Sequence, residues 1–167
     1  VFGDTGTTEF YTRSLLDALP ILEWFWVLLY NIIFYPLLFL FALVGSLFNQ
    51  KLRKGIIGRF QAVNQLKIYF NNIDANKIIY WFHASSYGEY LQVEAVLAGV
   101  KEIEPDAIAV MSFFSPSGYE QVKATNIDCK IYLPFDFPWT VHRALRIVNP
   151  RKFIFASYDI WPNWIWI

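Results

Sequence analysis

Between Trp24 and Phe48 the chain carries no charged residue, and only Asn31 and Ser46 in this run are clearly polar. At about 1.5 Å of rise per residue, the run would form a helix of roughly 37 Å, longer than the hydrocarbon core of a bilayer at about 30 Å. We therefore expect residues 22–49 to form a membrane-anchor helix, kinked at Pro36, which membrane helices tolerate. A buried hairpin, or a helix lying in one leaflet, is the alternative, because Pro36 could divide the run.

The residues that flank this run indicate how it would lie in a membrane. Aromatic side chains, which favour the bilayer interface, crowd its first end. Basic residues follow its second end with no acidic residue among them: Lys51, Arg53, Lys54 and Arg59. The positive-inside rule then places the chain after residue 50 in the cytoplasm. We interpret residues 50–77 as a basic juxtamembrane connection, broken by Gly55 and Gly58, whose charges contact anionic lipid headgroups.

The first residues of the chain have a different character. Residues 1–21 contain the segment TTEFYTRSLLDALPI, which resembles the translation of a sequencing adapter joined to a reading frame. We interpret residues 1–21 as a non-native leader and set them aside in predicting the fold. A genuine, weakly amphipathic N-terminal segment is the alternative.

A buried strand, a tight turn and a helix follow one another near the middle of the chain. The unbroken apolar run from Ile78 to Phe82 is typical of a strand covered on both faces in a parallel α/β sheet. Apolar residues then recur at helical spacing up to Val100, so a helix is expected to pack back on the sheet. Ligands of open parallel sheets bind beyond the carboxyl ends of the strands. Glu89, at the start of this helix, therefore stands where chemistry would occur.

The alternation of strand and helix continues to the last residues. Strands are predicted over three later segments: residues 107–114, 130–133 and 152–156. This alternation predicts an α/β fold with a Rossmann-like parallel sheet over residues 78–167, expected to be a partial domain because a complete doubly wound domain would continue. In the usual strand order, 3-2-1-4, the first and fourth strands are neighbours. Glu89 and Asp159 would then emerge side by side.

Two helix boundaries carry local signals. Ser115 stands before Pro116, which suits the first position of a helix, although a capping box of Ser117 and Glu120 is an alternative start. Asn149, followed by a proline, would end the helix that precedes the fourth strand.

Polar residues near the predicted strand ends are candidates for binding. Backbone N–H groups around Ser115, Ser117 and Gly118 could hold a phosphate or hydroxyl at a helix start, with simple capping as the alternative. His83 could orient Glu89 or bind an acceptor, or it could be a buried core histidine.

Other features of the composition narrow the function. Asp136 is expected to cap the following helix rather than contact a ligand, and His142 is expected on the surface. The net charge of zero gives no reason to expect nucleic acid as a partner. The single cysteine, Cys129, excludes an intrachain disulfide and a cysteine metal site. The sequence has no Gly-rich phosphate loop and no His/Asp metal motif, so we predict no metal and no cofactor.

Four short motifs occur in an order and at a spacing that point to one family. They are FHASSYGE at 82–89, FSPSGYE at 114–120, YLPFDFP at 132–138 and DIWPN at 159–163. With the apolar anchor and the basic stretch after it, they resemble the N-terminal half of the 3-deoxy-D-manno-octulosonic acid (Kdo) transferases of lipopolysaccharide synthesis. The resemblance covers residues 22–167.

The resemblance implies a two-domain GT-B glycosyltransferase, of which this chain would be the acceptor-binding part. Members of the family transfer Kdo from CMP-Kdo to a lipid A precursor at the inner face of the cytoplasmic membrane. The implied partners are membrane lipid, the lipid A precursor and, through a C-terminal domain missing here, CMP-Kdo. A fragment without that domain is expected to be inactive alone.

The resemblance also implies roles for particular residues. An inverting transfer needs a general base for the attacking hydroxyl, and the Gly-Glu pair that fills this role in the family matches Gly88 and Glu89. Gly88 would suit a tight strand-to-helix turn and leave room for the acceptor sugar. The alternative for Glu89 is a first-turn residue that stabilises the helix dipole. Asp159, where the family often has Glu, would be a supporting carboxylate or a helix cap. The candidate acceptor-binding residues are His83, Ser86, Gly88, Ser115, Ser117 and Gly118.

Two other functions stay open from the sequence. The chain could belong to a membrane-anchored GT-B enzyme with another donor or acceptor, because these motifs do not specify the number of Kdo residues added or the acceptor. It could also be a non-catalytic, membrane-anchored α/β module.

Overall fold

The structure, a computed structural model, describes residues 24–123, 126–157 and 159–167. The leader expected at residues 1–21 lies outside the described residues. The chain divides into two units, one ending at Leu40 and the other beginning at Phe41. The sheet and the helices that pack on it all belong to the second unit.

The apolar run forms a helix, as the sequence predicts. Helical structure extends over Trp24–Phe48, and with a mean hydropathy of 2.4 over an 18-residue stretch this helix is long and apolar enough to cross a membrane. Its polar side chains bond to the backbone of the helix itself. Asn31 Nδ2 donates to the Val27 carbonyl at 2.9 Å, and Ser46 Oγ donates to the Leu43 carbonyl at 2.6 Å. Such internal bonds suit a helix in lipid, where no water replaces a missing partner.

The proline in this helix is accommodated by a wide turn. A π-helical turn, η1 (Tyr30–Phe34), precedes helix α2 (Tyr35–Phe48). The Tyr35 N–H bonds to the Tyr30 carbonyl, five residues earlier. Pro36 has no N–H to donate, and in a regular α-helix its ring collides with the carbonyl four residues earlier. Because a π-turn relieves this crowding, the helix continues on both sides of Pro36 and does not divide into a hairpin.

A long helix replaces most of the expected connection at residues 50–77. Gln50–Phe70 form one helix, α3, whose start is capped by Asn49, with its side chain accepting from two N–H groups of the first turn. The expectation that Gly55 and Gly58 break this segment is wrong, because α3 continues through both. A Cβ at Gly58 would collide with the Tyr132 ring. The glycine therefore allows α3 to lie close against the sheet.

Four parallel strands form one sheet in the order β3-β2-β1-β4, which is the usual order considered from the sequence. The strands are β1 (Ile79–Ala84), β2 (Ile108–Phe113), β3 (Cys129–Tyr132) and β4 (Lys152–Phe155). In register, Trp81 of β1 pairs with Val110 of β2 and with Phe153 of β4. β1 is thus a central strand covered on both faces, which explains its unbroken apolar run.

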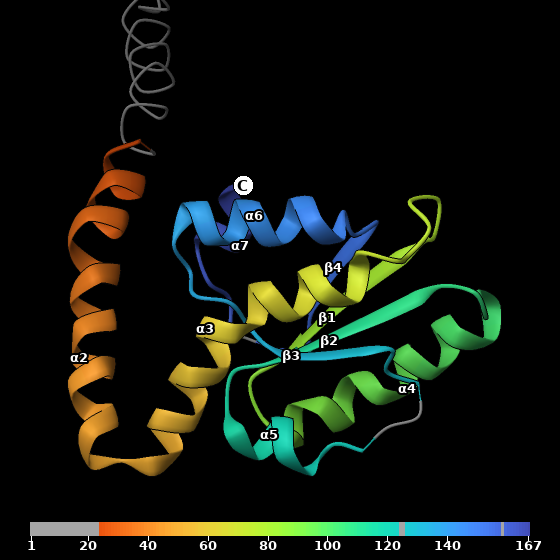
Figure 1. The fold of residues 1–167 in the computed structure, drawn as a ribbon, viewed down its shortest axis with the longest axis horizontal. Helices are drawn as coiled ribbons and strands as arrows, with labels where there is room; N and C mark the ends of the chain where they lie inside the picture. The colour runs from red at the N-terminus through yellow and green to blue at the C-terminus, as the bar shows by residue number, and fades with distance from the viewer. Residues whose placement is uncertain (1–23, 124–125, 158) are drawn as a thin grey trace, which may run out of the picture. The chain divides into compact units, whose positions relative to one another are not determined.

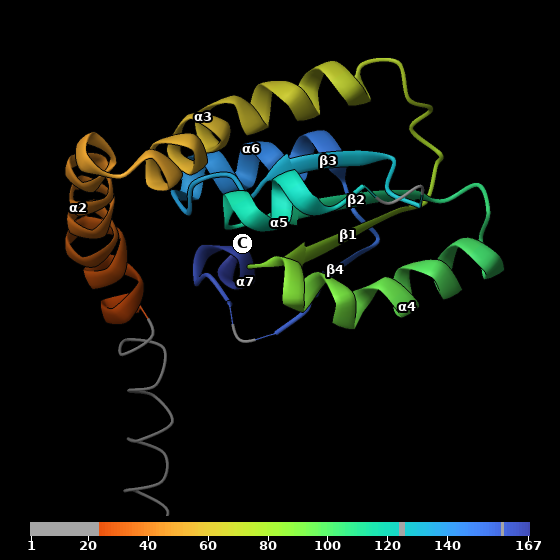
Figure 2. The same ribbon diagram turned by 90° about the horizontal axis from the view of Figure 1, so that it is seen from below.

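Helices cover both faces of the sheet (Figures 1 and 2). One face carries α3, α6 (Pro138–Val148) and α7 (Asn163–Trp166), and the other carries α4 (Tyr87–Ile103) and α5 (Pro116–Gln121). Successive residues of a strand point to opposite faces. Trp81 therefore packs in the core that includes Leu66 of α3 and Val141 of α6, and Phe82 packs in the core that includes Leu97 of α4. This three-layer arrangement confirms the α/β class.

Local signals set the ends of two helices as expected. Ser115 is the N-cap of α5, and Pro116 follows it as the first helical residue. Asn149 ends α6 in the left-handed conformation, with φ of 46°, and the proline after it does not continue the helix.

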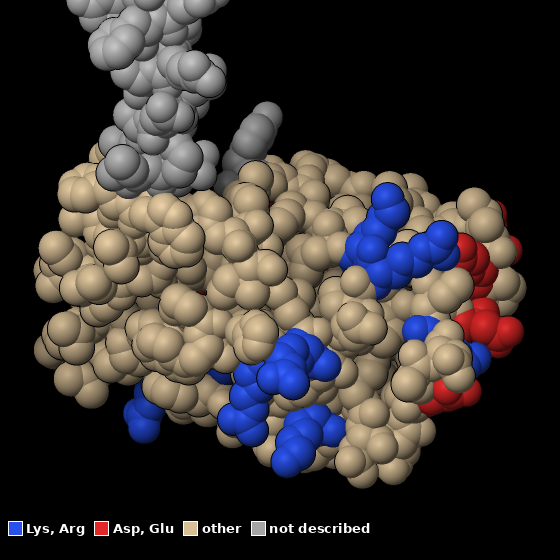
Figure 3. Space-filling view, turned by 90° about the horizontal axis from the view of Figure 1, so that it is seen from above, with Lys and Arg blue, Asp and Glu red and all other residues tan. Residues whose placement is uncertain are grey.

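Charge is unevenly distributed over the face drawn in Figure 3. The acidic side chains visible there gather at the right-hand end, where some Lys and Arg side chains also lie, and further Lys and Arg side chains occur over the rest of this face. Asp74, Glu104 and Asp106 lie in the segments that precede β1 and β2, at the amino ends of the strands. The carboxyl ends, where parallel sheets bind ligands, lie at the opposite end of the sheet.

Candidate functional site

The loops that follow β1 and β2 are joined beyond the sheet. The Phe114 N–H donates to the Ala84 carbonyl at 3.3 Å, and the Ser115 N–H donates to the Ser85 carbonyl at 2.8 Å. These bonds continue the strand pairing past the last sheet residues. The starts of α4 and α5 are therefore held side by side at the carboxyl edge, which brings Ser86 and Glu89 toward Ser115 and its neighbours.

Glu89 takes part in capping α4. Ser86 is the N-cap, and its Oγ accepts from the Glu89 N–H at 3.4 Å. Glu89 Oε2 in turn accepts from the Ser85 N–H at 2.6 Å. This resembles a capping box, except that the carboxylate bonds to the residue before the N-cap. In the described part of the chain this is the only hydrogen bond of the carboxylate, so Oε1 has no hydrogen-bond partner there.

Gly88 lies beside Glu89 with open space around it. It is an exposed residue inside α4, and no described glycine has a positive φ. The expectation that Gly88 serves a tight turn is therefore wrong, since its backbone conformation is open to any residue. A Cβ built at Gly88 would have only Ser86 Oγ near it, at 4.0 Å. The position leaves room next to the carboxylate, and use of this space by an acceptor sugar stays a prediction.

His83 and Asp159 form a pair at the carboxyl ends of neighbouring strands. His83 Nε2 lies 3.2 Å from Asp159 Oδ2, and His83 Nδ1 lies 3.0 Å from Ser112 Oγ. The His83 side chain is 1% exposed and that of Asp159 is 25% exposed. Asp159 does not cap the following helix, because α7 begins after Pro162 without a side-chain cap. The bonds of His83 therefore lead to Asp159 and not to Glu89.

The polar groups at the start of α5 bond to one another. Ser115 Oγ accepts from the Gly118 N–H at 3.4 Å and lies 2.9 Å from Ser117 Oγ. A Cβ at Gly118 would lie 2.5 Å from the Phe113 ring and 3.2 Å from the Ser86 backbone. Gly118 is thus needed for the close approach of α5 to the start of α4. Capping occurs as the alternative proposed, and binding of a phosphate or hydroxyl here stays a prediction.

Asp136 has a different role from the one that the sequence predicted, whereas His142 lies where it was expected. Phe137 is the N-cap of α6 and no side chain caps this start, so the expected cap by Asp136 is wrong. Asp136 is instead 2% exposed, and its Oδ2 accepts from the Asn163 N–H at 3.3 Å. It ties the loop after β3 to α7. His142 is exposed, as predicted.

An arginine of α3 reaches the candidate site, which sequence reasoning missed. Arg59 Nη2 donates to the Phe114 carbonyl at 2.7 Å, and its guanidinium carbon lies 3.9 Å from the centroid of the Phe114 ring. Phe114 in turn stacks on Trp161, with centroids 5.3 Å apart. Arg59 therefore anchors the loop that carries Ser115. No signal in the sequence separates it from the other basic residues of its segment.

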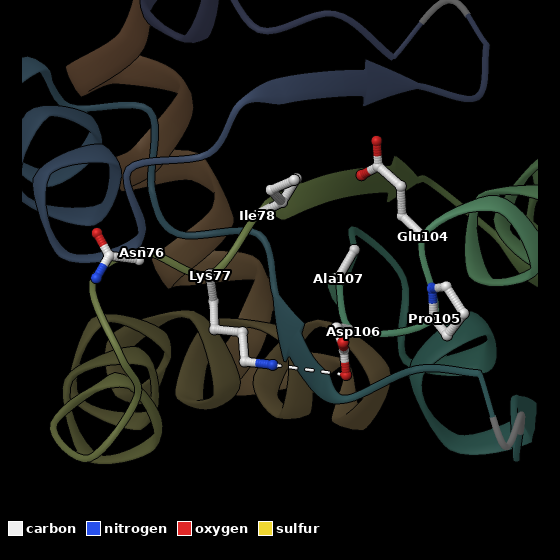
Figure 4. Close-up of a pocket in the computed structure, with 7 residues that line it drawn as sticks. All are labelled: Asn76, Lys77, Ile78, Glu104, Pro105, Asp106 and Ala107. Atoms are coloured by element: carbon white, nitrogen blue, oxygen red, sulfur yellow. Dashed lines mark ion pairs between the residues drawn. The ribbon is translucent and has the colours of Figure 1, made fainter.

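Two hollows lie at opposite ends of the sheet. One, of about 330 Å³, lies between α3 and the start of α6, beyond the carboxyl ends of the strands. Its aromatic and basic lining includes Arg59, Phe60, Phe137, Trp139 and Arg143. The other, of about 240 Å³, is shown in Figure 4 and lies before the amino ends of β1 and β2, where Lys77 and Asp106 pair at 3.7 Å. The second hollow is therefore remote from the candidate site.

The metal-binding potential of the site is limited. Among the residues that the structure describes, no group of three or more His, Cys, Asp or Glu side chains could hold a metal ion. Glu89, in the first turn of α4 after β1, and Asp159, after β4, follow neighbouring strands; that their carboxylates lie side by side and act in catalysis stays a prediction.

Comparison with known proteins gives one consistent result. The sequence profile described as 3-deoxy-D-manno-octulosonic-acid transferase (kdotransferase) matches residues 54–167. A 3-deoxy-D-manno-octulosonic acid transferase of Haemophilus influenzae is 33% identical over 87 residues, which are 51% of this chain and 20% of that protein. The Aquifex aeolicus enzyme of the same name is 30% identical over 87 residues, 51% of this chain and 24% of that protein. A probable mitochondrial enzyme of this name from Arabidopsis thaliana is 28% identical over 88 residues. The matched part thus spans a fifth to a quarter of these relatives.

Proposed function

Because this chain belongs to the Kdo transferase family, we propose that it is the acceptor-binding part of an inverting glycosyltransferase that moves Kdo from CMP-Kdo to a lipid A precursor. The observation that carries this proposal is the placement of the Glu89 carboxylate at the carboxyl edge of the sheet, next to the open space at Gly88. A family resemblance alone would support the activity without assigning the base.

Glu89 supplies the base in this proposal. The Ser85 N–H holds Oε2, so the carboxylate has a defined orientation, and Oε1 takes the proton of the acceptor hydroxyl. As that proton leaves, the hydroxyl oxygen bonds to the anomeric carbon of Kdo, and the bond from this carbon to the phosphate oxygen of CMP breaks. CMP leaves with the electron pair of the broken bond. Attack opposite the leaving group inverts the anomeric configuration.

Features next to the site support a lipid acceptor. The hollow between α3 and α6 presents aromatic side chains together with two arginines, and Phe60 and Trp139 in it are 61% and 68% exposed. Aromatic rings and arginines are favoured at the interface between membrane and water. We assign this end of the second unit to the membrane surface, where a lipid-linked sugar would be presented to Glu89.

The apolar helix supports the proposed location. A helix that can span a membrane, followed by Lys51, Arg53 and Lys54 with no acidic residue among them, fits an inner-membrane protein whose sheet faces the cytoplasm. Binding of CMP-Kdo is assigned to a second, donor-binding domain of the GT-B type. By this proposal the chain of residues 1–167 alone binds acceptor without transferring sugar.

The test is an assay of CMP release and Kdo transfer by the product of the whole reading frame, with a lipid A precursor as acceptor. Glu89→Gln keeps an oxygen that can accept from the Ser85 N–H, so the helix start is retained while the base is lost. We expect kcat to fall by about 10² to 10⁴-fold, the usual contribution of a general base. Glu102→Gln, on the exposed side of the same helix, is the matched control and should behave as wild type.

The outcomes separate two levels of the proposal. If Glu89→Gln turned over like Glu102→Gln, Glu89 would be a helix cap and the base would have to be sought elsewhere. If the wild-type protein released no CMP from CMP-Kdo with this acceptor, the assignment of donor and acceptor would be wrong.

A further inference from the structure

A chain of buried polar groups lies beneath the carboxyl end of β1. Trp81 Nε1 donates to Ser112 Oγ at 2.9 Å. His83 Nδ1 lies 3.0 Å from the same Oγ and 3.1 Å from the Ser112 carbonyl oxygen. Trp81 and Ser112 are fully buried and His83 is 1% exposed. Such groups are expensive to bury unless each is bonded, so their arrangement restricts where the hydrogens lie.

The hydrogen on Nε2 of His83 follows from its partner. A carboxylate only accepts hydrogen bonds, so the 3.2 Å contact between Nε2 and Asp159 Oδ2 requires a hydrogen on Nε2. With that hydrogen on Nε2, Nδ1 of the neutral ring accepts from the Ser112 hydroxyl, which also lies 3.2 Å from the Phe82 carbonyl as a donor. The Nε2 hydrogen is directed at Asp159.

The His83 ring is also fixed by its neighbours in the sheet. His83 pairs in register with Ser112 of β2 and with Phe155 of β4. The Phe155 ring meets the imidazole edge-on, with centroids 5.9 Å apart and planes at 87°. The imidazole therefore has polar contacts at both nitrogens and an aromatic ring against it, which together leave one orientation.

Asp159 lacks comparable support from its own segment. It follows β4 in a stretch without regular structure, and within the described residues its carboxylate has no hydrogen bond except the one from His83. Its side chain is 25% exposed, so it can reach solvent or an acceptor, whereas His83 cannot. A partly exposed carboxylate at the sheet edge is thus held by a buried imidazole.

We infer that His83, oriented by Ser112 and Trp81, is a positioning residue that holds the Asp159 carboxylate toward the acceptor at the end of β1. This inference rests on the proposed function, because it assumes that an acceptor binds between Glu89 and Asp159. His83 would then orient Asp159, and not Glu89 as considered from the sequence. Ser112 and Trp81 are added to the residues on which the site depends.

A mutant cycle on the product of the whole reading frame tests the coupling. Asp159→Asn and His83→Leu are compared singly and together, with kcat and the acceptor KM measured separately and thermal unfolding as a check of the fold. We expect each single change to reduce kcat/KM by roughly 3- to 100-fold, and the double change to reduce it little further, because neighbours that act as a unit are not additive. His83→Gln, which can keep an N–H directed at Asp159, should restore part of the loss. If the double variant lost kcat/KM by the product of the two single losses, the inference would be overturned.

A second measurement is independent of the activity. The chain of residues 1–167 contains two histidines, so ¹⁵N-histidine NMR in detergent micelles, with His142→Gln for assignment, reports the ring nitrogens of His83. We expect a hydrogen on Nε2 whose signal shifts in Asp159→Asn. An Nε2 without a hydrogen, or an Nε2 signal that does not shift in Asp159→Asn, would overturn the inference. If no Kdo transfer were found while the NMR result held, the proposed function would fail and the His83–Asp159 contact would stand.

Discussion

Replacing Gly88 by alanine separates the needs of the fold from those of the acceptor. Gly88 lies in the first turn of α4 with a negative φ, and a Cβ there approaches only Ser86 Oγ, at 4.0 Å. A contact of 4.0 Å is ordinary van der Waals contact, so no strain is introduced. Alanine is favoured over glycine in a helix by about 0.5 to 1 kcal/mol, less at a helix end. We therefore expect Gly88→Ala to leave the free energy of unfolding unchanged or raised by up to about 1 kcal/mol.

The effect on activity should have the opposite sign. The new methyl group would occupy the space beside Glu89 in which the acceptor sugar is proposed to sit, so the acceptor KM should rise and kcat/KM should fall. The assay is Kdo transfer at varied acceptor concentration, together with denaturant unfolding of the same preparations. Gly99→Ala is the matched control, because Gly99 lies in the same helix and a Cβ there has nothing within 4 Å.

Two results would refute this reasoning about Gly88. If Gly88→Ala transferred Kdo as well as Gly99→Ala, the space beside Glu89 would not be the acceptor site. If Gly88→Ala unfolded more easily than wild type, the space at Gly88 would not be open in the folded protein.

Two further predictions concern packing and pH. Gly58→Ala would place a methyl group in the Tyr132 ring, so we expect overpacking to lower the free energy of unfolding by about 1 to 3 kcal/mol. Denaturant unfolding measures this change, with Gly99→Ala, expected to gain stability, as the control. Equal stability of the two variants would contradict the close approach of α3 to β3. Burial, with a smaller effect of Asp128, raises the pKa of the Cys129 thiol from 9.0 to about 12. Between these values the unfolded state has lost the proton that the folded state keeps, so stability should fall as the pH rises above 9. Cys129→Ala should lose less stability over this interval than wild type, and an identical pH dependence would argue against the raised pKa.

Local sequence patterns predicted most of the elements. The apolar run from Ile78 to Phe82 and the later strand segments lie in or beside the four observed strands. Ser115 and Asn149 mark the helix ends where they were expected. These signals succeed because strand burial, capping and helix termination depend on residues within a few positions of one another.

Two of the errors, at α3 and at Asp136, have a common cause. Gly55 and Gly58 suggested breaks because glycine is unfavourable inside an isolated helix, but α3 continues through both, and at Gly58 the helix packs closely against Tyr132. Asp136 stands where a cap is expected, yet it bonds to Asn163, 27 residues away. In each case a distant partner overrode the local preference.

The sequence by itself determined that this chain contains an apolar helix able to span a membrane, a parallel α/β sheet, and a carboxylate at the start of the helix after the first strand. Only the tertiary structure decided which groups hold the carboxylates. Glu89 bonds to Ser85 within its own turn, whereas Asp159 bonds to His83, 76 residues earlier. Pairing of neighbouring strands brings those two residues together, and no local pattern encodes a contact over that separation, because it depends on the register of β1 against β4.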